Sequence, residues 1–359
     1  MGMGKKTILI GKSCRWAQLS LRMLAAVLCA VLLLAFVPGC TPVPQRYEVT
    51  YLSLFDTVVT IVLYADNEAE AQEAFRAIYN DLVRYDALFD IYDDHPGINN
   101  LKAVNDNAGK APVAVEPELF SLISFGKEVY ALTGGRVNIA FGSVLSLWHD
   151  ARTAGIENPD AAALPERVAL EHAAEHTDIE NVILDEDAGT VFLADPELRL
   201  DVGAIGKGYA AQLTCDNARA RGVTSMLLNL GGNVCALGAR ADGKPWRIDV
   251  QDPDDPSAAL CTVELADASL VTSGGYQRYY TVAGERYHHI IDPDTLMPAD
   301  YEKAVTVMHA DSGLADAFST ALFNLPYEQG RALAEENGVS AVWELRDGST
   351  EWLGIVPVE

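Results

Sequence analysis

A glycine-rich turn joins a predicted strand to a predicted helix over residues 201–209, and it contains one lysine, Lys207. Backbone N–H groups at the start of a helix, with a lysine beside them, suit a phosphate group. The spacing excludes a Walker A motif, because Gly208 stands where Ser or Thr is needed, and the glycines do not fit G-x-G-x-x-G. Glycines in such turns are also used only because the backbone conformation requires them. A phosphate site and a purely structural turn therefore both stay open.

Asp316 and Thr320 stand four residues apart in a second predicted helix, so they share one face. A carboxylate and a hydroxyl at this spacing offer two oxygen ligands to one cation. Magnesium commonly takes one or two such ligands beside phosphate oxygens and water. The plainer alternative is structural, since an acidic residue near a helix N-terminus is favoured by the dipole and a Thr hydroxyl often bonds its own backbone.

Two pairs of histidines also offer chemistry. His288 and His289 are adjacent in a predicted strand over 287–291, so at most one faces a site. A neutral imidazole there could act as a general base near pH 7. His172 and His176 share a helix face, but their Ala-rich surroundings hold no third ligand, and the sequence favours a plain exposed helix over a zinc site.

Two further Gly-rich turns, at 229–233 and 272–276, lie at predicted strand ends. They either bring backbone close to a ligand or simply close hairpins. The chain has no G-x-S-x-G nucleophile elbow, which argues against a serine hydrolase.

The predicted secondary structure that positions these residues differs between the first and second parts of the chain. The first part is mainly helical beside a strand pair or long strand, and strands dominate after residue 179. Strand runs beside separate helices predict an α+β fold with mixed, mostly antiparallel sheets and packed helices, in two intimately associated lobes of about 47–178 and 179–359. The expected helices are 68–89, 116–133, about 165–176, about 206–221 and 313–336, with a loop at 93–112 and an irregular stretch at 136–164. The expected strands are 47–63, 180–184, 190–194, 198–202, 224–229, 246–250, 261–265, 269–272, 278–282 and 287–291, with a closing hairpin of 339–345 and 351–356.

The composition narrows the class of protein. The 359 residues hold 26 Lys and Arg against 51 Asp and Glu, and 49% are hydrophobic, which excludes intrinsic disorder. A net charge of −25 without a basic stripe argues against a nucleic-acid partner. Beyond the N-terminal segment the cysteines are Cys215, Cys235 and Cys261; we expect three buried thiols rather than a disulfide scaffold or a thiolate zinc site.

The N-terminus indicates export. It carries basic residues without any acid, then an apolar run over 24–37 that is shorter than the roughly 20 residues of a membrane-spanning helix, and then Cys40. Residues 37–40 resemble a bacterial lipobox. This resemblance implies a lipoprotein signal peptide over 1–39, a lipidated tether over 40–46, and membrane anchoring through Cys40. An uncleaved N-terminal anchor helix is the alternative, and either places the body on the extracytoplasmic side.

Taken in order, these segments resemble the FAD:protein FMN transferase family of the ApbE type. The resemblance covers essentially the whole chain after the leader, and its strength lies in the ordered set rather than in any single motif. The family commonly has Met-Gly where Phe55-Asp56 stands and Gly where Leu296 stands. The matching segments are 55–57, 134–138 with 147–148, 201–209, 229–233, 245–247, 272–274, 289–293 and 315–320.

The resemblance implies an ApbE-like domain over 47–359 and an Mg²⁺-dependent transfer. FMN would pass from FAD to a threonine hydroxyl of an exported or membrane acceptor protein, such as a redox-pump subunit or an electron-transfer protein, with release of AMP. Two other functions stay open: a pyrophosphatase that splits FAD into FMN and AMP, and a non-catalytic flavin-binding lipoprotein. The Asp316 and Thr320 pair disfavours mere storage, which needs no metal at the scissile bond.

The resemblance also implies roles for individual residues. His289 matches the family's candidate base. The implied magnesium ligands are Asp316, Thr320 and the main-chain carbonyl of Ala204. The implied flavin-binding residues are Phe55, Tyr92, Asn138, Asp201, Lys207 and Ile290.

Overall fold

The computed structural model describes residues 43–255, 257–276 and 278–358, and Pro44–Glu359 form one compact unit. The predicted signal peptide, Cys40 and the first residues of the tether lie outside the described residues, whereas Gln45 and Arg46 already belong to the first strand. Among the described helices, none has the length and apolar character needed to cross a bilayer.

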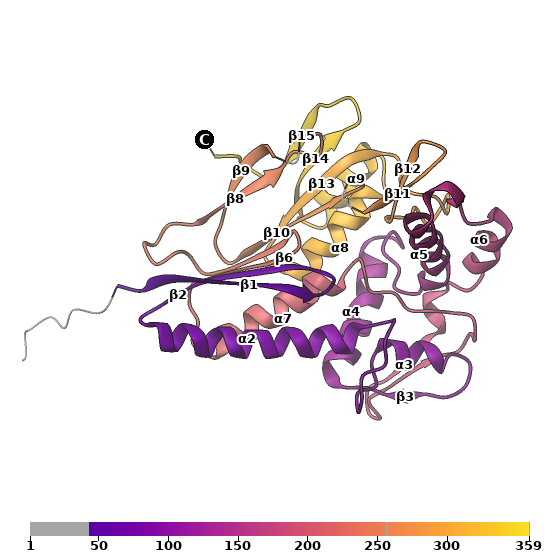
Figure 1. The fold of residues 1–359 in the computed structure, drawn as a ribbon, viewed down its shortest axis with the longest axis horizontal. Helices are drawn as coiled ribbons and strands as arrows, with labels where there is room; N and C mark the ends of the chain where they lie inside the picture. Colours follow the sequence, from indigo (N-terminus) through magenta and orange to yellow (C-terminus); the bar gives the residue numbers. More distant parts are fainter. Residues whose placement is uncertain (1–42, 256, 277, 359) are drawn as a thin grey trace, which may run out of the picture. The chain divides into compact units, whose positions relative to one another are not determined.

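The centre of the fold is an eight-stranded sheet, counted within the described residues, in which all neighbouring strands pair antiparallel (Figure 1). The strands β1 and β2 precede the predicted lobe boundary and the others follow it, so the division into lobes stays a prediction. The antiparallel sheet with packed helices confirms the predicted α+β class. In spatial order the strands are β1 (Gln45–Leu54), β2 (Thr57–Ala65), β6 (Met226–Leu230), β7 (Asn233–Leu237), β10 (Ala268–Gly274), β13 (Glu302–His309), β14 (Ser340–Leu345) and β15 (Thr350–Leu353).

The two faces of this sheet are covered differently, as the alternation of side chains along a strand requires. Ile61 and Leu63 of β2 pack toward the helices, and Val62 between them packs toward a separate hairpin. The hairpin consists of β8 (Trp246–Gln251) and β9 (Ala259–Leu265). The helices on the first face are α2 (Glu68–Phe89), α7 (Gly206–Ala220), α8 (Ser312–Phe323) and α9 (Tyr327–Glu336) (Figure 1).

The remaining elements form two further apolar clusters, one of which includes residues of α2, α7 and α8. They extend the molecule beyond the end of the large sheet where β1 turns into β2 (Figure 1). These elements are α3 (Leu101–Asp106), β3 (Val113–Ala114), α4 (Pro117–Leu132), α5 (Gly142–Glu157), η1 (Pro159–Ala161), α6 (Arg167–Ala174), η2 (Ile179–Asn181), β4 (Val182–Asp185), β5 (Thr190–Leu193), β11 (Tyr279–Val282) and β12 (Glu285–His288).

Several sequence-based expectations about local structure are wrong. The predicted loop 93–112 contains α3, capped by the Asn100 side chain, and the predicted irregular stretch 136–164 contains α5. The helix expected over 313–336 is broken before α9 by Pro326, which has no N–H to continue it. The strand expected over 198–202 is only an isolated bridge at Arg199, and β7 and β13 were not anticipated.

The cysteines carry no disulfide among the described residues. Cys215 and Cys235 are buried thiols, as expected. Cys261 is only partly buried, because it lies on β9 at the margin of the hairpin, so the expectation of three buried thiols holds for two of them.

Candidate active site

The first turn of α7 meets α8 at a contact that only glycine permits. A Cβ at Gly208 would lie 2.3 Å from the carbonyl oxygen of Ser312 and 2.4 Å from the Cβ of Asp316. In this close approach the Gly208 N–H donates to Asp316 Oδ2 at 2.7 Å. The missing side chain therefore allows the Asp316 carboxylate to lie at the N-terminus of α7, where the helix dipole favours negative charge.

The same hydrogen bond leaves a carbonyl oxygen without an internal partner. In a regular helix the Gly208 N–H would donate to the carbonyl of Ala204, four residues earlier. Among the described residues, no N–H group donates to that oxygen. Thr320 follows one helical turn after Asp316, and its hydroxyl is 3.4 Å from Ser273 Oγ. Ala204, Asp316 and Thr320 line one cavity, and their oxygens are of the kind that Mg²⁺ prefers.

Asp316 is a buried carboxyl group, and its neighbours shift its pKa in opposite directions. Burial raises its pKa, while the positive charge of Lys207 and the N–H of Gly208 lower it. The Asn233 amide also lies close enough to lower this pKa, yet Asn233 Nδ2 is buried and makes no hydrogen bond of normal distance and angle with the described residues. A buried donor without a partner beside a buried carboxylate fits a site that a ligand completes.

The cavity at this junction has a volume of about 770 Å³, within the usual range for small-molecule sites. Its walls come from segments more than 200 residues apart in the sequence. All ten residues that the family resemblance implies line it: Phe55, Tyr92, Asn138, Asp201, Ala204, Lys207, His289, Ile290, Asp316 and Thr320.

His288 and His289 have separate environments. His288 Nε2 is 2.8 Å from the carbonyl oxygen of Ala299, its Nδ1 accepts from the Ile290 N–H at 3.3 Å, and its ring packs against Phe323. His289, just after β12, is open to the cavity and makes no hydrogen bond within the described part of the chain. Desolvation by the cavity walls, with the cations Arg278 and Lys207, lowers the pKa of His289, so the ring is neutral at pH 7.

The cations of the cavity fall into two kinds. Arg136 is paired with Asp294 at 2.7 Å and with Asp292 at 3.6 Å. Lys207 and Arg278 have no carboxylate within 4.0 Å among the described residues, and Arg278 donates only to the Asp56 carbonyl oxygen, at 3.4 Å. Lys207 in the first turn of α7, together with Arg278 and Arg152, gives the cavity three cations without a carboxylate within 4.0 Å among the described residues, so the cavity suits an anion.

Asp201 opens the glycine-rich turn and is held by it. Its Oδ1 accepts from the Gly203 N–H at 2.7 Å, and its own N–H donates to the Ile139 carbonyl oxygen. Desolvation raises the pKa of Asp201, and the Gly203 N–H and nearby cations, Lys207 among them, lower it. The carboxylate thus fixes the turn at the same time as it borders the cavity.

Phe55 enters the cavity from the two-residue turn between β1 and β2. Phe55 and Asp56 have φ values of 52° and 51°, a conformation that suits the twist of a hairpin but that side chains other than glycine rarely adopt. The Phe55 N–H donates to Asp86 Oδ1 of α2 at 3.0 Å, which holds the turn. Burial raises the pKa of Asp86.

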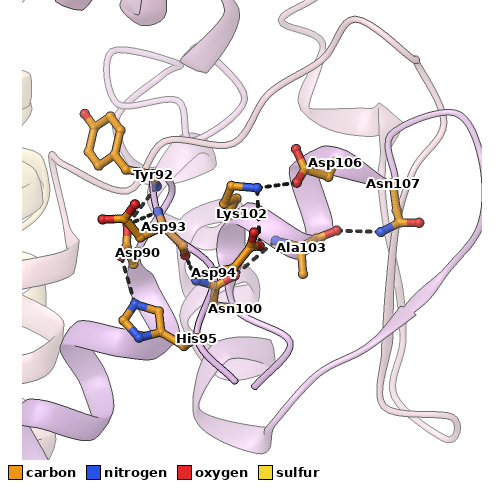
Figure 2. Close-up of polar contacts among 10 residues, drawn as sticks. All are labelled: Asp90, Tyr92, Asp93, Asp94, His95, Asn100, Lys102, Ala103, Asp106 and Asn107. Carbon is orange, nitrogen blue, oxygen red and sulfur yellow. Dashed lines mark hydrogen bonds and ion pairs between the residues drawn. The ribbon is translucent and has the colours of Figure 1, made fainter. Parts of the chain in front are cut away.

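Tyr92 lies on the segment between α2 and α3, which Asp90 organises. Figure 2 shows the Asp90 carboxylate bonded to the N–H groups of Tyr92 and Asp93 and to the His95 ring. The Tyr92 side chain is 53% exposed, and its hydroxyl is 3.2 Å from His149 Nδ1. Burial of its inner part raises the Tyr92 pKa.

Asn138 borders the cavity, but its side chain is used within the protein. Its Nδ2 donates to the Thr177 carbonyl oxygen at 2.8 Å, and its Oδ1 accepts from the Ala140 N–H at 2.9 Å. Both ends of the amide are therefore engaged, and Asn138 supports the cavity wall. Ile290 is also part of the apolar core, at 8% exposure.

Sequence reasoning did not single out three polar lining residues: Asn233, Arg278 and Arg152. Asn233 was noted only within a Gly-rich turn. Arg152 lies on α5, which was not anticipated, and its Nη2 is 3.3 Å from His149 Nδ1. No local pattern marks Arg278, which reaches the cavity only because the chain before β11 lies beside the Phe55 turn.

A cavity with a buried carboxylate, unpaired cations and aromatic side chains in its wall defines a site for an anionic small molecule that has an apolar part. The sequence profile of the ApbE family matches residues 55–343, and the chain belongs to this family. It is 35% identical to an FAD:protein FMN transferase of Klebsiella pneumoniae over 293 residues, covering 81% of this chain and 86% of that one. It is 36% identical to an FAD:protein FMN transferase of Treponema pallidum, over 69% and 71% of the two chains.

Solved structures agree with this assignment. The ApbE protein of Thermotoga maritima superposes with a TM-score of 0.77 at 29% identity, covering 86% of this chain and 97% of that one. The apo flavinyl transferase ApbE of Pseudomonas stutzeri gives 0.72 at 27% identity, covering 87% and 95%. The predicted family and fold are thereby confirmed, and the protein is an enzyme of the transferase class.

Proposed function

We propose that the protein is an FAD:protein FMN transferase that moves FMN from FAD to a threonine hydroxyl of an acceptor protein and releases AMP. The observation that carries this proposal is the α7–α8 junction, where Asp316, the open Ala204 carbonyl and the unpaired Lys207 border one cavity. The name of these relatives supports the transfer of FMN from FAD to a protein.

The residues at the junction fit a magnesium ion. Asp316 and Thr320, with the carbonyl oxygen of Ala204, would hold it, since the donors are all oxygens and one of them is a buried carboxylate. A bound Mg²⁺ neutralises negative charge on the attacked phosphate and on the departing AMP.

The protein's own groups bind and orient the diphosphate of FAD. Lys207 and Arg278 provide positive charge and have no carboxylate within 4.0 Å among the described residues, and the buried Asn233 amide lies beside the Asp316 carboxylate. In phosphoryl transfer most of the rate enhancement comes from positioning and charge stabilisation. These groups therefore hold the FMN-side phosphorus where an incoming hydroxyl can reach it.

His289 accepts the proton of the acceptor threonine. The threonine oxygen forms a bond to the FMN phosphorus while the bond to the AMP oxygen breaks, so the proton must leave the hydroxyl. A ring that is neutral at pH 7, open to the cavity and not hydrogen-bonded to the described residues has a free lone pair for this proton, and the negative charge of a bound diphosphate would raise its lowered pKa. His288 is occupied by Ala299 and Ile290 and holds the chain in place instead.

The aromatic side chains at the opening receive the isoalloxazine ring. Phe55 and Tyr92 come from different segments, and each is fixed by a carboxylate, Asp86 or Asp90, that bonds its backbone N–H. Aromatic faces favour a flat heteroaromatic ring. Asp201 and Ile290 complete the walls on this side, and Asn138 acts through the wall that it supports.

The site of action is also part of the proposal. Lipidation of Cys40 and removal of residues 1–39 would hold the enzyme at the extracytoplasmic face of a membrane, where its acceptor is an exported protein or a redox-pump subunit. The basic and apolar composition of the leader supports this placement.

One assay separates the three functions considered. The purified protein is incubated with FAD and Mg²⁺, with an acceptor protein that carries a flavinylation threonine or with its Thr→Val counterpart, while AMP and protein-bound flavin fluorescence are followed. We expect AMP and bound fluorescence in equal amounts, and only with the threonine acceptor. AMP release without labelling would establish the pyrophosphatase instead, and tightly bound intact FAD would establish storage.

A further inference from the structure

A second cluster of potential ligands lies at the C-terminal end of α6, and it does not line the cavity. His172, Glu175 and His176 each offer one ligand atom within 4.8 Å of the others. The two histidine rings lie edge to face with centroids 5.1 Å apart. Two imidazoles one helical turn apart are a common half of a transition-metal site, but two ligands on a helix rarely suffice.

The fold supplies the ligand that the helix sequence lacks. Glu197, on the segment after β5, has Oε2 3.4 Å from His172 Nε2 and Oε1 3.7 Å from His176 Nε2. Ligand atoms about 2.1 Å from a tetrahedral ion are about 3.4 Å from one another. Each histidine Nε2 therefore already lies from a Glu197 oxygen at nearly the spacing of two ligands on one ion.

The surroundings of His176 resemble those of a metal-bound histidine. Its Nδ1 is 2.8 Å from Asp195 Oδ2. A carboxylate that accepts a proton-bearing Nδ1 leaves the lone pair on Nε2, the nitrogen that would bind a metal. His176 Nε2 is buried and has no hydrogen-bond partner within the described residues. A buried ring nitrogen that faces a carboxylate at 3.7 Å without a hydrogen bond is suited to an ion between them.

We propose that His172 and His176, each through Nε2, and the Glu197 carboxylate bind one Zn²⁺ ion as a structural site; Glu175 lies on the Nδ1 side of His172 and is not a ligand. Imidazole ligands select zinc and its neighbours over magnesium, which prefers oxygen ligands alone. None of these ligands lines the cavity that contains Asp316 and His289, so the ion would be structural rather than catalytic. The expectation of a plain exposed helix at 172–176 is replaced by this proposal, because Glu197 is distant in sequence and near in space.

The ion would join two segments that support the cavity wall. Thr177, next to His176, provides the carbonyl oxygen to which Asn138 donates. The Glu197 carbonyl oxygen accepts from the Ser143 hydroxyl at 2.7 Å, and the chain continues from there toward Asp201. Zinc would thus stabilise the α6 end against the 195–201 segment. The proposal does not depend on the transferase reaction.

Zinc titration tests the proposal directly. Full-length protein without a histidine tag is titrated with Zn²⁺ by calorimetry in saturating Mg²⁺, which occupies oxygen-only sites. We expect one ion per chain with a dissociation constant of about 1 μM or below. Co²⁺ in place of Zn²⁺ should give the visible absorption of a tetrahedral ion.

Single substitutions at the proposed ligands and at a neighbouring control residue identify which side chains bind zinc. His172→Ala should weaken zinc binding at least 30-fold, and Asp195→Asn about 10- to 100-fold. His172 is 61% exposed, so its replacement leaves the fold intact, which circular dichroism checks. Glu171→Gln, on the same helix and paired with Arg167, is the matched control and should bind as the unaltered protein does. Equal zinc affinity in the unaltered protein and His172→Ala, or no binding at all, would overturn the proposal and leave the cluster as ordinary ion pairs.

Discussion

The two ends of the cavity are built in opposite ways. The α7–α8 junction, made by Lys207, Gly208 and Asp316, consists of helices in contact and is buried. The aromatic rim, made by Phe55 and Tyr92, consists of a strained turn and an exposed segment, each held by one carboxylate. In the proposed function, the reacting phosphate would lie at the buried end, where charges are placed most rigidly, and the flavin ring at the more exposed end.

The largest expected effect comes from removing the charge at the junction. Asp316→Asn keeps the size of the side chain and an oxygen that accepts from Gly208, but it loses the anionic ligand. We expect the rate of FMN transfer to fall by about 10³-fold or more at saturating FAD and Mg²⁺. Transfer at a tenth of the normal rate would show that the junction does not hold the metal.

The contact between the two helices should be intolerant of a single methyl group. Gly208→Ala places a Cβ against Ser312 and Asp316, so we expect a loss of about 2–3 kcal/mol in the free energy of unfolding, measured by urea denaturation. Gly330→Ala on α9 is the control, because its nearest neighbours are 3.5 Å away; it should be neutral or slightly stabilising.

The aromatic rim should respond more mildly. Tyr92→Ala removes an exposed ring, so we expect the KM for FAD to rise about 10-fold with kcat changed less than about 3-fold. Tyr92→Phe, which keeps the ring and loses only the contact with His149, should stay close to the unaltered enzyme. A fall in kcat as large as that of Asp316→Asn would remove the distinction between the two ends.

We expect the substitution Asp316→Asn, which lowers activity, to raise the stability of the metal-free protein. Because burial raises its pKa in the folded state, the folded protein binds the proton more tightly, and stability without metal falls as pH rises through that raised pKa. Asp316→Asn removes this dependence. We therefore expect the metal-free variant to be more stable than the unaltered protein at pH 8, by on the order of 1 kcal/mol. Lower stability in thermal melts at pH 8 would contradict the assignment of a carboxylate that burial destabilises.

The smallest effect is expected at the turn that carries Phe55. Asp56 has φ of 51° and an exposed side chain. Asp56→Gly should stabilise the protein by about 0.5 kcal/mol, because glycine adopts this conformation without strain. A loss of stability in the same denaturation assay would show that the turn depends on the aspartate side chain.

What could be predicted from the sequence was local. Helical spacing placed Asp316 and Thr320 on one face, and the predicted boundaries of α2 agree with the structure. The role of Gly208 could not be predicted, because it depends on a contact across 108 positions of the chain. His172 and His176 were dismissed for the same reason, since Glu197 reaches them only through the fold.

The crystal structure of the protein with FAD and Mn²⁺ tests the central claim most directly, because the anomalous signal of manganese locates the ion. The account predicts a peak within coordination distance of Asp316, Thr320 and the Ala204 carbonyl oxygen, with the diphosphate between that peak and Lys207. A dinucleotide bound elsewhere, or no peak at Asp316 at saturating metal, would contradict it.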